Sequence, residues 1–301
     1  MASMAGRVVV EGDDLCFVPR FAFVEGTAYS AVVDGTTSAR LVRPRIPREP
    51  TAEVVAIRPD VEEVPRNLLR VYVEFSSSMA EGQASSQVRL LDDRGAVLDH
   101  ALLVVEDELW DRDRCRLTVL LDPARIKRGL ATHRSLGYPL RSGEAVRIVV
   151  GDGFLDAGGA PLRHGAERRF LVGGDERRTV DPGAWVVVPP AAGSCESLRV
   201  DFDRPLDHGL LVSCLSVVDA EGRAVAGVPA VGPGGRSWAF SPVDPWTADD
   251  HRLIVDPRLE DLAGNSVLRV FDRDLSDPSA VTATSDDQVV VGFRPGGDRA
   301  E

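Results

Sequence analysis

The chain has 301 residues, enough for about two domains of ordinary size. Hydrophobic residues make up 44% and charged residues 27%, which is the balance of a folded protein rather than a disordered one. The formal net charge of −12 argues against nucleic-acid binding, and no apolar run approaches the roughly 18 residues of a membrane-spanning helix. We therefore expect neither nucleic acid nor membrane insertion.

Residues 1–45 are predicted to form the last strands of a truncated β unit. The segment LCFVPRFAFVEGTAYSAVVDG (15–35) is a partial match to the two longer repeats that follow it. Because an isolated half-sandwich has unpaired edges, we expect this unit to pack on the next domain. The opening residues lack the basic and apolar regions of a signal peptide. This predicts a cytoplasmic protein, or an extracellular one if a leader has been removed.

Short β-rich runs separated by Gly, Pro and Asp dominate the rest of the chain, a pattern typical of an all-β sandwich. Several of the runs alternate apolar and polar residues, so that one face packs and the other meets water. Strands are expected at 69–75, 88–92, 117–121, 145–150, 198–202 and 253–255. Pro-rich boundaries then divide the chain into domains at 51–174 and 180–295.

An internal repeat organises both domains. LLRVYVEFSSSM (68–79) and VRLLDDRGAVLD (88–99) correspond to SLRVDFDRPL (197–206) and LSVVDAEGRAVAG (215–227). Each copy contains an Asp-x-x-Gly hairpin, in which Asp and the conformationally permissive Gly suit a tight turn. The later strands recur as well, with 117–162 corresponding to 237–267.

These repeats resemble the bacterial Ig-like domain of S-layer and other surface proteins. The resemblance rests on the strand that ends in FSSSM or FDRPL, on the Asp-x-x-Gly hairpin, and on the closing LEDLAGNSV (259–267). It implies an all-β fold of tandem Ig-like β-sandwich domains preceded by a partial N-terminal β unit. It also implies a bacterial protein with a spacer, structural or adhesive role.

The two repeats differ at one corner. Pro123 and Leu140 are seventeen residues apart, whereas the corresponding Pro242 and Trp246 are four apart, so the first domain carries thirteen extra residues. The inserted basic loop, ARIKRGLATHRSLGY (124–138), opens with a short helix predicted from Asp122 as N-cap and Pro123 in the first turn. Its lysine, Lys127, is the only one in the chain. An ordered basic loop on an acidic protein is a natural place for binding.

An acidic, aromatic stretch, VVEDELWDRDR (104–114), precedes the insertion. Its acids are expected opposite the basic loop, either as salt bridges that hold the loop or as the wall of a cleft for a polar ligand. A protein interface is the third alternative. The predicted ligand-binding residues are Trp110, Asp111, Arg125, Lys127, Arg128 and His133.

Two functions from different classes follow. The leading hypothesis is a non-catalytic binding or structural module that recognises an unknown protein or a polar small molecule at the 104–138 corner. The alternative is a small cofactor-independent enzyme, an isomerase, cyclase or hydrolase, with Lys127 and His133 acting with Glu108 as acid–base groups. The enzyme requires these groups to converge in a pocket at the corner or between the domains.

Metal and cofactor chemistry have little support in the residue pattern. The five histidines are isolated, and none of the four cysteines forms a CxxC pair. The acidic loops at 151–159 and 256–265 fit tight turns better than calcium sites. Phosphate-binding and nucleophile-elbow motifs are missing, so no metal and no cofactor are predicted.

Overall fold

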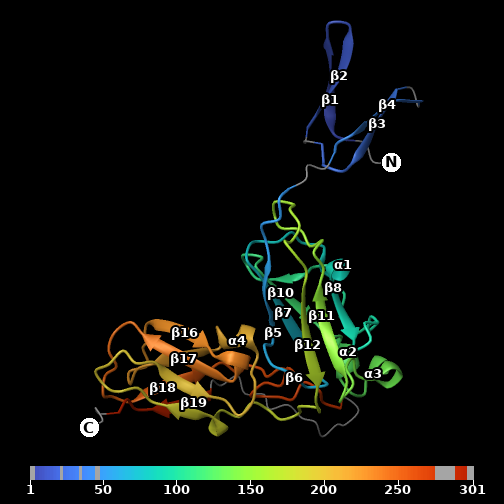
Figure 1. Cartoon of the computed structure of the whole chain (residues 1–301). Coiled ribbons are helices and arrows are strands. Elements are labelled where there is room, and N and C mark those ends of the chain that lie inside the picture. The colour runs from blue at the N-terminus through green and yellow to red at the C-terminus, as the bar shows by residue number, and fades with distance from the viewer. Residues whose placement is uncertain (1–3, 21–22, 34–35, 45–47, 275–288, 297–301) are drawn as a thin grey trace. The chain divides into compact units, whose positions relative to one another are not determined.

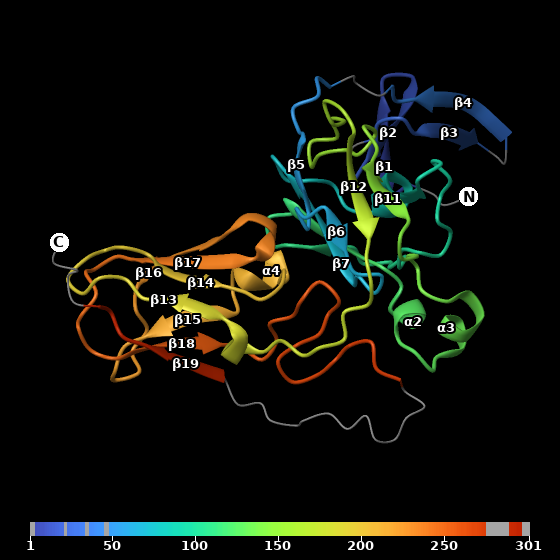
Figure 2. The same cartoon turned by 60° about the horizontal axis from the view of Figure 1, so that its bottom comes forward.

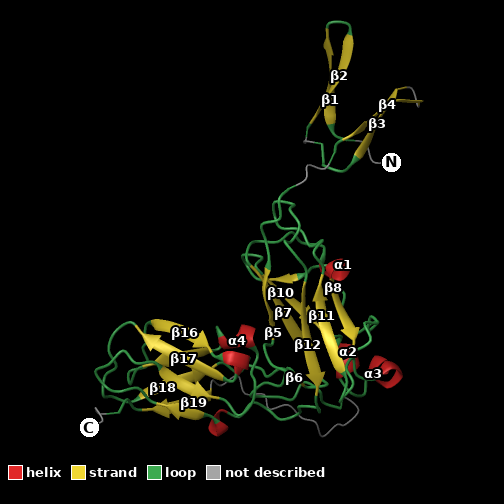
Figure 3. Ribbon diagram, in the orientation of Figure 1, coloured by secondary structure: helices red, strands yellow, loops and turns green. Residues whose placement is uncertain are grey.

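The computed structural model describes residues 4–20, 23–33, 36–44, 48–274 and 289–296 (Figure 1). Strands and loops dominate, and the helices are short (Figure 3). The chain divides into two compact units, residues 1–49 and 50–301, and the second unit contains both full repeats. In the described residues no helix is long and apolar enough to cross a membrane.

The N-terminal unit consists of two antiparallel hairpins. β1 (Gly6–Glu11) pairs with β2 (Asp14–Pro19), and β3 (Ala28–Val33) pairs with β4 (Thr36–Val42). Many of its apolar side chains are exposed, which is the expected consequence of two sheets with only two strands each. Packing of this unit on the next domain stays a prediction.

The first full repeat is a sandwich of two four-stranded sheets with the orders β5-β7-β10-β9 and β6-β12-β11-β8. Alternate residues of both sheets enter one core, including Val71, Val73, Leu117 and Ile148. The strands are β5 (Val54–Arg58), β6 (Glu63–Val64), β7 (Arg70–Phe75), β8 (Val88–Asp92), β9 (Leu109–Trp110), β10 (Arg116–Leu120), β11 (Ala145–Val150) and β12 (Ala166–Val172).

The second repeat is a sandwich with the sheet orders β13-β14-β17-β16 and β15-β18-β19. Its core contains Trp185, Trp238 and Trp246, whose burial excludes an exposed aromatic platform. The strands are β13 (Val186–Val188), β14 (Leu198–Asp201), β15 (Leu215–Val218), β16 (Gly227–Val231), β17 (Ser237–Pro242), β18 (His251–Val255) and β19 (Val289–Phe293). The all-β sandwich class predicted from the sequence is therefore confirmed.

The repeat in the sequence is also a repeat in topology. Strands β7, β8, β10 and β11 occupy the same sheet positions as β14, β15, β17 and β18. Both predicted hairpins contain a glycine with positive φ, 84° at Gly95 and 85° at Gly222. In each hairpin the aspartate side chain accepts a backbone hydrogen bond, as the Asp-x-x-Gly pattern predicts.

The described helices are all short and lie in the connections. They are α1 (Ala84–Gln87), α2 (Pro123–Ile126), α3 (Ala131–Leu136) and α4 (His208–Leu211), with 3-10 turns η1 (Pro182–Ala184) and η2 (Pro233–Gly235). α2 begins as predicted, because Asp122 caps it by accepting a hydrogen bond from Ala124 N. α3 was not predicted from the sequence, since its N-cap is Leu130, which offers no side-chain cap.

One loop of the second sandwich, residues 256–274, packs into the first sandwich (Figure 2). Leu262 belongs to the core of the first sandwich, and Leu69 N donates a 2.9 Å hydrogen bond to Leu262 O. Gly264 has a φ of +79°, and a Cβ atom there would lie 2.4 Å from Leu69 Cδ2. The joint between the sandwiches therefore depends on close packing as well as on charge.

We expect Gly264→Ala to destabilise the protein more than Gly222→Ala. Both substitutions place a Cβ on a left-handed residue, which costs roughly 1–2 kcal/mol. Only Gly264 adds a clash with buried side chains, because the nearest atom to a Cβ at Gly222 is the flexible end of Arg252, 3.4 Å away. Overpacking costs about 1–3 kcal/mol more. Urea unfolding of the two variants measures the difference, and equal losses would contradict a tight joint.

Candidate functional site

The predicted site residues divide between the two ends of β10. Trp110 pairs with Leu117 near the start of this strand, whereas the 124–138 insertion follows its end. Figure 1 shows the same separation, with α1 and α2 towards different ends of the first sandwich. The predicted corner is therefore two separate places.

At the start of β10, the side chains of the acidic stretch hold the local chain. Glu108 accepts hydrogen bonds from Ala84 N at 2.6 Å and from Trp110 Nε1 at 2.7 Å. Asp111 Oδ1 accepts from the backbone N–H groups of Cys115 and the next residue. The Trp110 ring packs edge-on against a core phenylalanine. These contacts give Glu108, Trp110 and Asp111 structural roles in the segment around β9 and the start of β10.

At the other end of β10, Arg125 closes the insertion. Its guanidinium donates to five backbone carbonyl oxygens, those of Asp99, His100, Leu136, Gly137 and Tyr138. His133 Nδ1 contacts the carbonyl oxygen of Arg125, and the His133 ring packs edge-on against Tyr138. The insertion is thus an ordered loop, as predicted, and the Arg125 side chain holds it from within.

Two basic residues of the insertion reach the 256–274 loop of the second sandwich. Lys127 Nζ lies 4.4 Å from the centroid of the Phe271 ring, a cation–π contact. Arg128 Nε donates to Asp272 Oδ1 at 3.3 Å. The countercharge for Arg128 is therefore Asp272, and not a carboxylate of the 104–114 stretch, because that stretch lies at the other end of β10.

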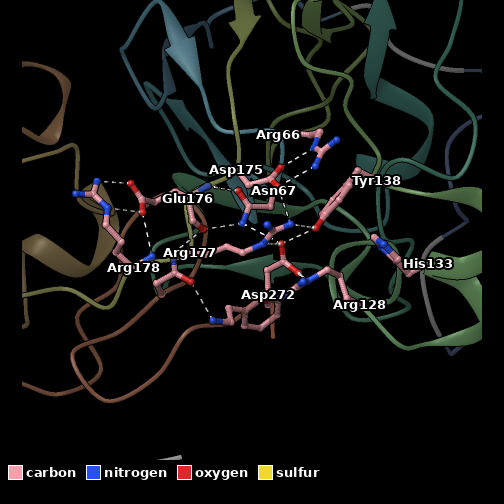
Figure 4. A network of polar contacts seen from close by, with 12 residues as sticks. Arg66, Asn67, Arg128, His133, Tyr138, Asp175, Glu176, Arg177, Arg178 and Asp272 are labelled. Carbon is pink, nitrogen blue, oxygen red and sulfur yellow. Dashed lines mark hydrogen bonds and ion pairs between the residues drawn. The ribbon is translucent and has the colours of Figure 1, made fainter. Parts of the chain in front are cut away.

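Asp272 is the centre of a polar network between the sandwiches (Figure 4). Its side chain has no exposed surface, and it has four polar partners. Tyr138 donates to Oδ2 at 2.7 Å, Arg177 Nε at 3.0 Å and Asn67 Nδ2 at 3.3 Å, while Arg128 contacts Oδ1. Burial and the bond to Asp272 raise the pKa of Tyr138 to about 12, so its hydroxyl stays a donor at neutral pH.

The linker between the sandwiches is held by the two asparagines of the chain. Asn67 and Asn265 are both fully buried, and both donate to the carbonyl oxygen of Glu176. Glu176 N donates back to Asn67 Oδ1 at 3.0 Å. One asparagine comes from each sandwich, so a single linker peptide is bound from both sides.

A second buried cluster joins β7 to the second sandwich. Tyr72 donates to Asp207 Oδ1 at 2.6 Å, and Arg70 forms ion pairs with Asp207 and Glu260. Burial and the nearby Asp207 charge raise the pKa of Tyr72. Gly209 allows this approach, because a Cβ there would lie 2.7 Å from the Tyr72 ring.

A hollow of about 480 Å³ lies between the two sandwiches. Several charged side chains on its wall are already paired, Arg204 with Asp261 and Glu176 with Arg178. Neither Lys127, His133 nor Glu108 lines it. Those three groups have separate partners, and no set of three or more His, Cys, Asp or Glu in the described residues is placed to hold a metal ion.

Sequence reasoning missed Asn67, Tyr138, Asp175, Arg177 and Asp272, which build the junction. One signal was present in the sequence: asparagine occurs only at 67 and 265, and both positions proved to be buried at the linker. The pairing partner of the insertion, Asp272, carries no such signal.

Comparisons with known proteins give weak similarities only. No protein-family model and no curated protein matches the chain. Among solved structures, domains 1–6 of the surface layer protein SbsC match with 12% identity and a TM-score of 0.28, covering 68% of this chain and 24% of that one. The MG0-NIE-MG1 part of Escherichia coli alpha-2-macroglobulin matches with 9% identity and a TM-score of 0.26, covering 68% and 66%.

The four N-terminal Ig domains of Dscam1 match with 9% identity and a TM-score of 0.22, covering 71% of this chain and 48% of that one. The chain thus spans about a quarter of the SbsC fragment that it resembles. The all-β sandwich fold rests on the strand order of the chain itself.

Asp261 gives a test of the junction by pH. Burial raises the pKa of its carboxyl from 3.8 to about 6. The folded protein then binds a proton that the unfolded chain releases near pH 4, so the free energy of unfolding falls as the pH rises from about 4 to 6. We expect this group to contribute on the order of 2–3 kcal/mol to that fall.

Urea unfolding at several pH values, with Asp261→Asn as the variant, measures this contribution. The variant should lack this part of the pH dependence. The control is Asp256→Asn, because hydrogen bonding to Arg258 lowers the pKa of Asp256 and gives a contribution of opposite sign. An Asp261 carboxyl that titrates near 3.8 by NMR would contradict the prediction.

Proposed function

We propose that this chain is a non-catalytic structural and binding module, in which two Ig-like sandwiches are held in one relative geometry. The observation that carries this proposal is the buried Asp272 carboxylate, which the second sandwich contributes and the first sandwich and linker neutralise. Recognition is assigned to the exposed part of the 104–138 region.

The two sandwiches are held in one geometry by the cost of leaving a buried charge without partners. A buried carboxylate is tolerated only when ion pairs and hydrogen bonds replace its hydration. Rotation of one sandwich against the other would separate Asp272 from Arg128, Tyr138 and Asn67 together. The cluster of Arg70, Tyr72 and Asp207 imposes the same condition at a second point.

The insertion has a structural role in this proposal. Two of the cations that favour binding at this loop, Lys127 and Arg128, already contact Phe271 and Asp272. The first part of the acidic stretch, residues 104–109, remains exposed, with 75% exposure at Val104. Recognition of a partner is therefore assigned to the 104–109 part of the predicted corner rather than to the insertion.

The enzyme alternative is not favoured. General acid–base catalysis needs groups within hydrogen-bond reach of one another or of a common substrate. Glu108 is bonded to Ala84 and Trp110, Lys127 lies on Phe271, and His133 contacts the insertion backbone. A structural role accounts for each of these contacts.

We expect Asp272→Ala to uncouple the two sandwiches. The variant loses the centre of the network and leaves Arg128 and Arg177 without this countercharge, at a cost of about 2–3 kcal/mol, between an exposed and a fully buried pair. Calorimetry should show one unfolding transition for the natural protein and two for the variant. NMR relaxation should give equal tumbling times for both sandwiches only in the natural protein.

The matched control is Glu167→Gln, which removes the surface ion pair with Arg147 inside one sandwich. It should leave a single transition and change stability by less than about 1 kcal/mol. Independent tumbling of the two sandwiches in the natural protein would refute the proposed rigid module.

A further inference from the structure

The edge strand that pairs with β10 in the first sandwich is interrupted, whereas the corresponding edge strand of the second sandwich is continuous. Leu103 N donates to Leu120 O at 2.9 Å, and Leu109 pairs with Thr118. Five residues, 104–108, therefore face only Val119 on β10. The corresponding edge strand β16 pairs with β17 without a break, from Gly227 opposite Pro242 to Val231 opposite Trp238.

An apolar pocket of about 80 Å³ lies at this interruption. Its size suits one aliphatic side chain and is far below the roughly 300 Å³ of a site for a drug-sized ligand. Aliphatic side chains around it are exposed, 75% at Val104 and 42% at Leu109. The pocket is lined by Ala84, Ser85, Val88, Leu102, Leu103, Val104, Val105, Glu108, Leu109, Leu117, Thr118, Val119 and Leu120.

Acidic groups stand beside the pocket and are available to a partner. Glu106 and Asp107 are exposed, and among the described contacts of the chain neither side chain has an ion pair or a hydrogen bond. The paired Glu108 carboxylate adds negative charge at the wall of the pocket itself. An approaching segment with basic residues would be attracted to this edge, and an acidic one repelled.

We propose that this interrupted edge, residues 103–109 with the pocket behind it, docks an extended segment of a partner protein. The segment carries an aliphatic side chain flanked by arginine or lysine at the second position on each side. In an extended strand those three side chains share one face, so the aliphatic group enters the pocket while the cations flank it beside the acidic segment that contains Glu106 and Asp107. This inference names the partner for the recognition proposed at 104–109, on which it rests, and it is independent of the rigid junction.

The edge of a sheet favours an extended occupant. An added strand gains main-chain hydrogen bonds at an open sheet edge, and a pocket for one side chain supplies specificity. The contact area is small, so the dissociation constant is expected in the range of roughly 10–500 µM. Screening of the exposed acids predicts that added salt weakens binding.

The experiment titrates the full chain, labelled with ¹⁵N, with a capped heptapeptide of sequence TRTLTRT. Saturable NMR shifts are expected at residues 84–88, 102–110 and 117–120. Two matched peptides, TRTSTRT and TETLTET, remove the aliphatic anchor and reverse the charge, and each should bind at least fivefold more weakly.

Variants of the protein then test the two parts of the surface. Ser85→Phe, at an exposed position beside the pocket, should abolish saturable shifts because its ring occupies the pocket mouth. Glu106→Gln combined with Asp107→Asn should raise the dissociation constant at least fivefold. Asp93→Asn, an exposed acid of the β8 hairpin, is the control and should change it less than twofold.

Several results would overturn the proposal. These are the lack of saturable binding up to about 1 mM peptide, equal binding of TRTSTRT, or shifts that map elsewhere. A dimer of the natural protein that Ser85→Phe dissociates would identify a second copy as the occupant instead. Peptide binding by Asp272→Ala separates this test from that of the junction, since the variant should bind TRTLTRT normally.

Discussion

Burial of the Asp272 carboxylate is the constraint on which the arrangement of the two sandwiches depends. A charge with no exposed surface needs partners in place of water, and here they come from three separate segments: Asn67, the insertion with Arg128 and Tyr138, and the linker with Arg177. Removing any one segment takes a hydrogen bond or a countercharge away from this buried carboxylate. The two sandwiches thus share one electrostatic centre although each has its own core.

Comparison of the two copies of the internal repeat distinguishes residues that the fold requires from features that only one copy has. Where the two copies agree, at the paired strands and the Asp-x-x-Gly hairpins, the residues satisfy sheet pairing and turn geometry. Where they differ, the first copy carries features that the second lacks. The 124–138 insertion contacts the 256–274 loop. The longer 104–108 segment interrupts the edge strand of its sheet, whereas the edge strand β16 of the second copy pairs with β17 without a break.

Lys127 is the only lysine among the 35 Lys and Arg residues of the chain, and arginine suits a protein joined by shared polar contacts. Arginine presents several donors in a fixed fork, so Arg125 binds five carbonyl oxygens and Arg177 contacts Tyr138, Asp175 and Asp272. A lysine ammonium is a single point charge and could not span such sets. Lys127 instead contacts a ring face, where a compact cation is sufficient.

The sequence by itself determined the fold class, the positions of six strands, the two Asp-x-x-Gly hairpins, the Asp122 cap and the existence of an ordered insertion, because alternation, capping and turn chemistry are local. Only the tertiary structure decided what the insertion contacts. Arg128 and Asp272 are 144 residues apart, and neither has a local pattern that names the other. The sequence predicts the acids of the 104–114 stretch opposite the basic loop, and the enzyme alternative requires Glu108 to meet Lys127, whereas β10 carries the two segments to opposite ends of a sandwich.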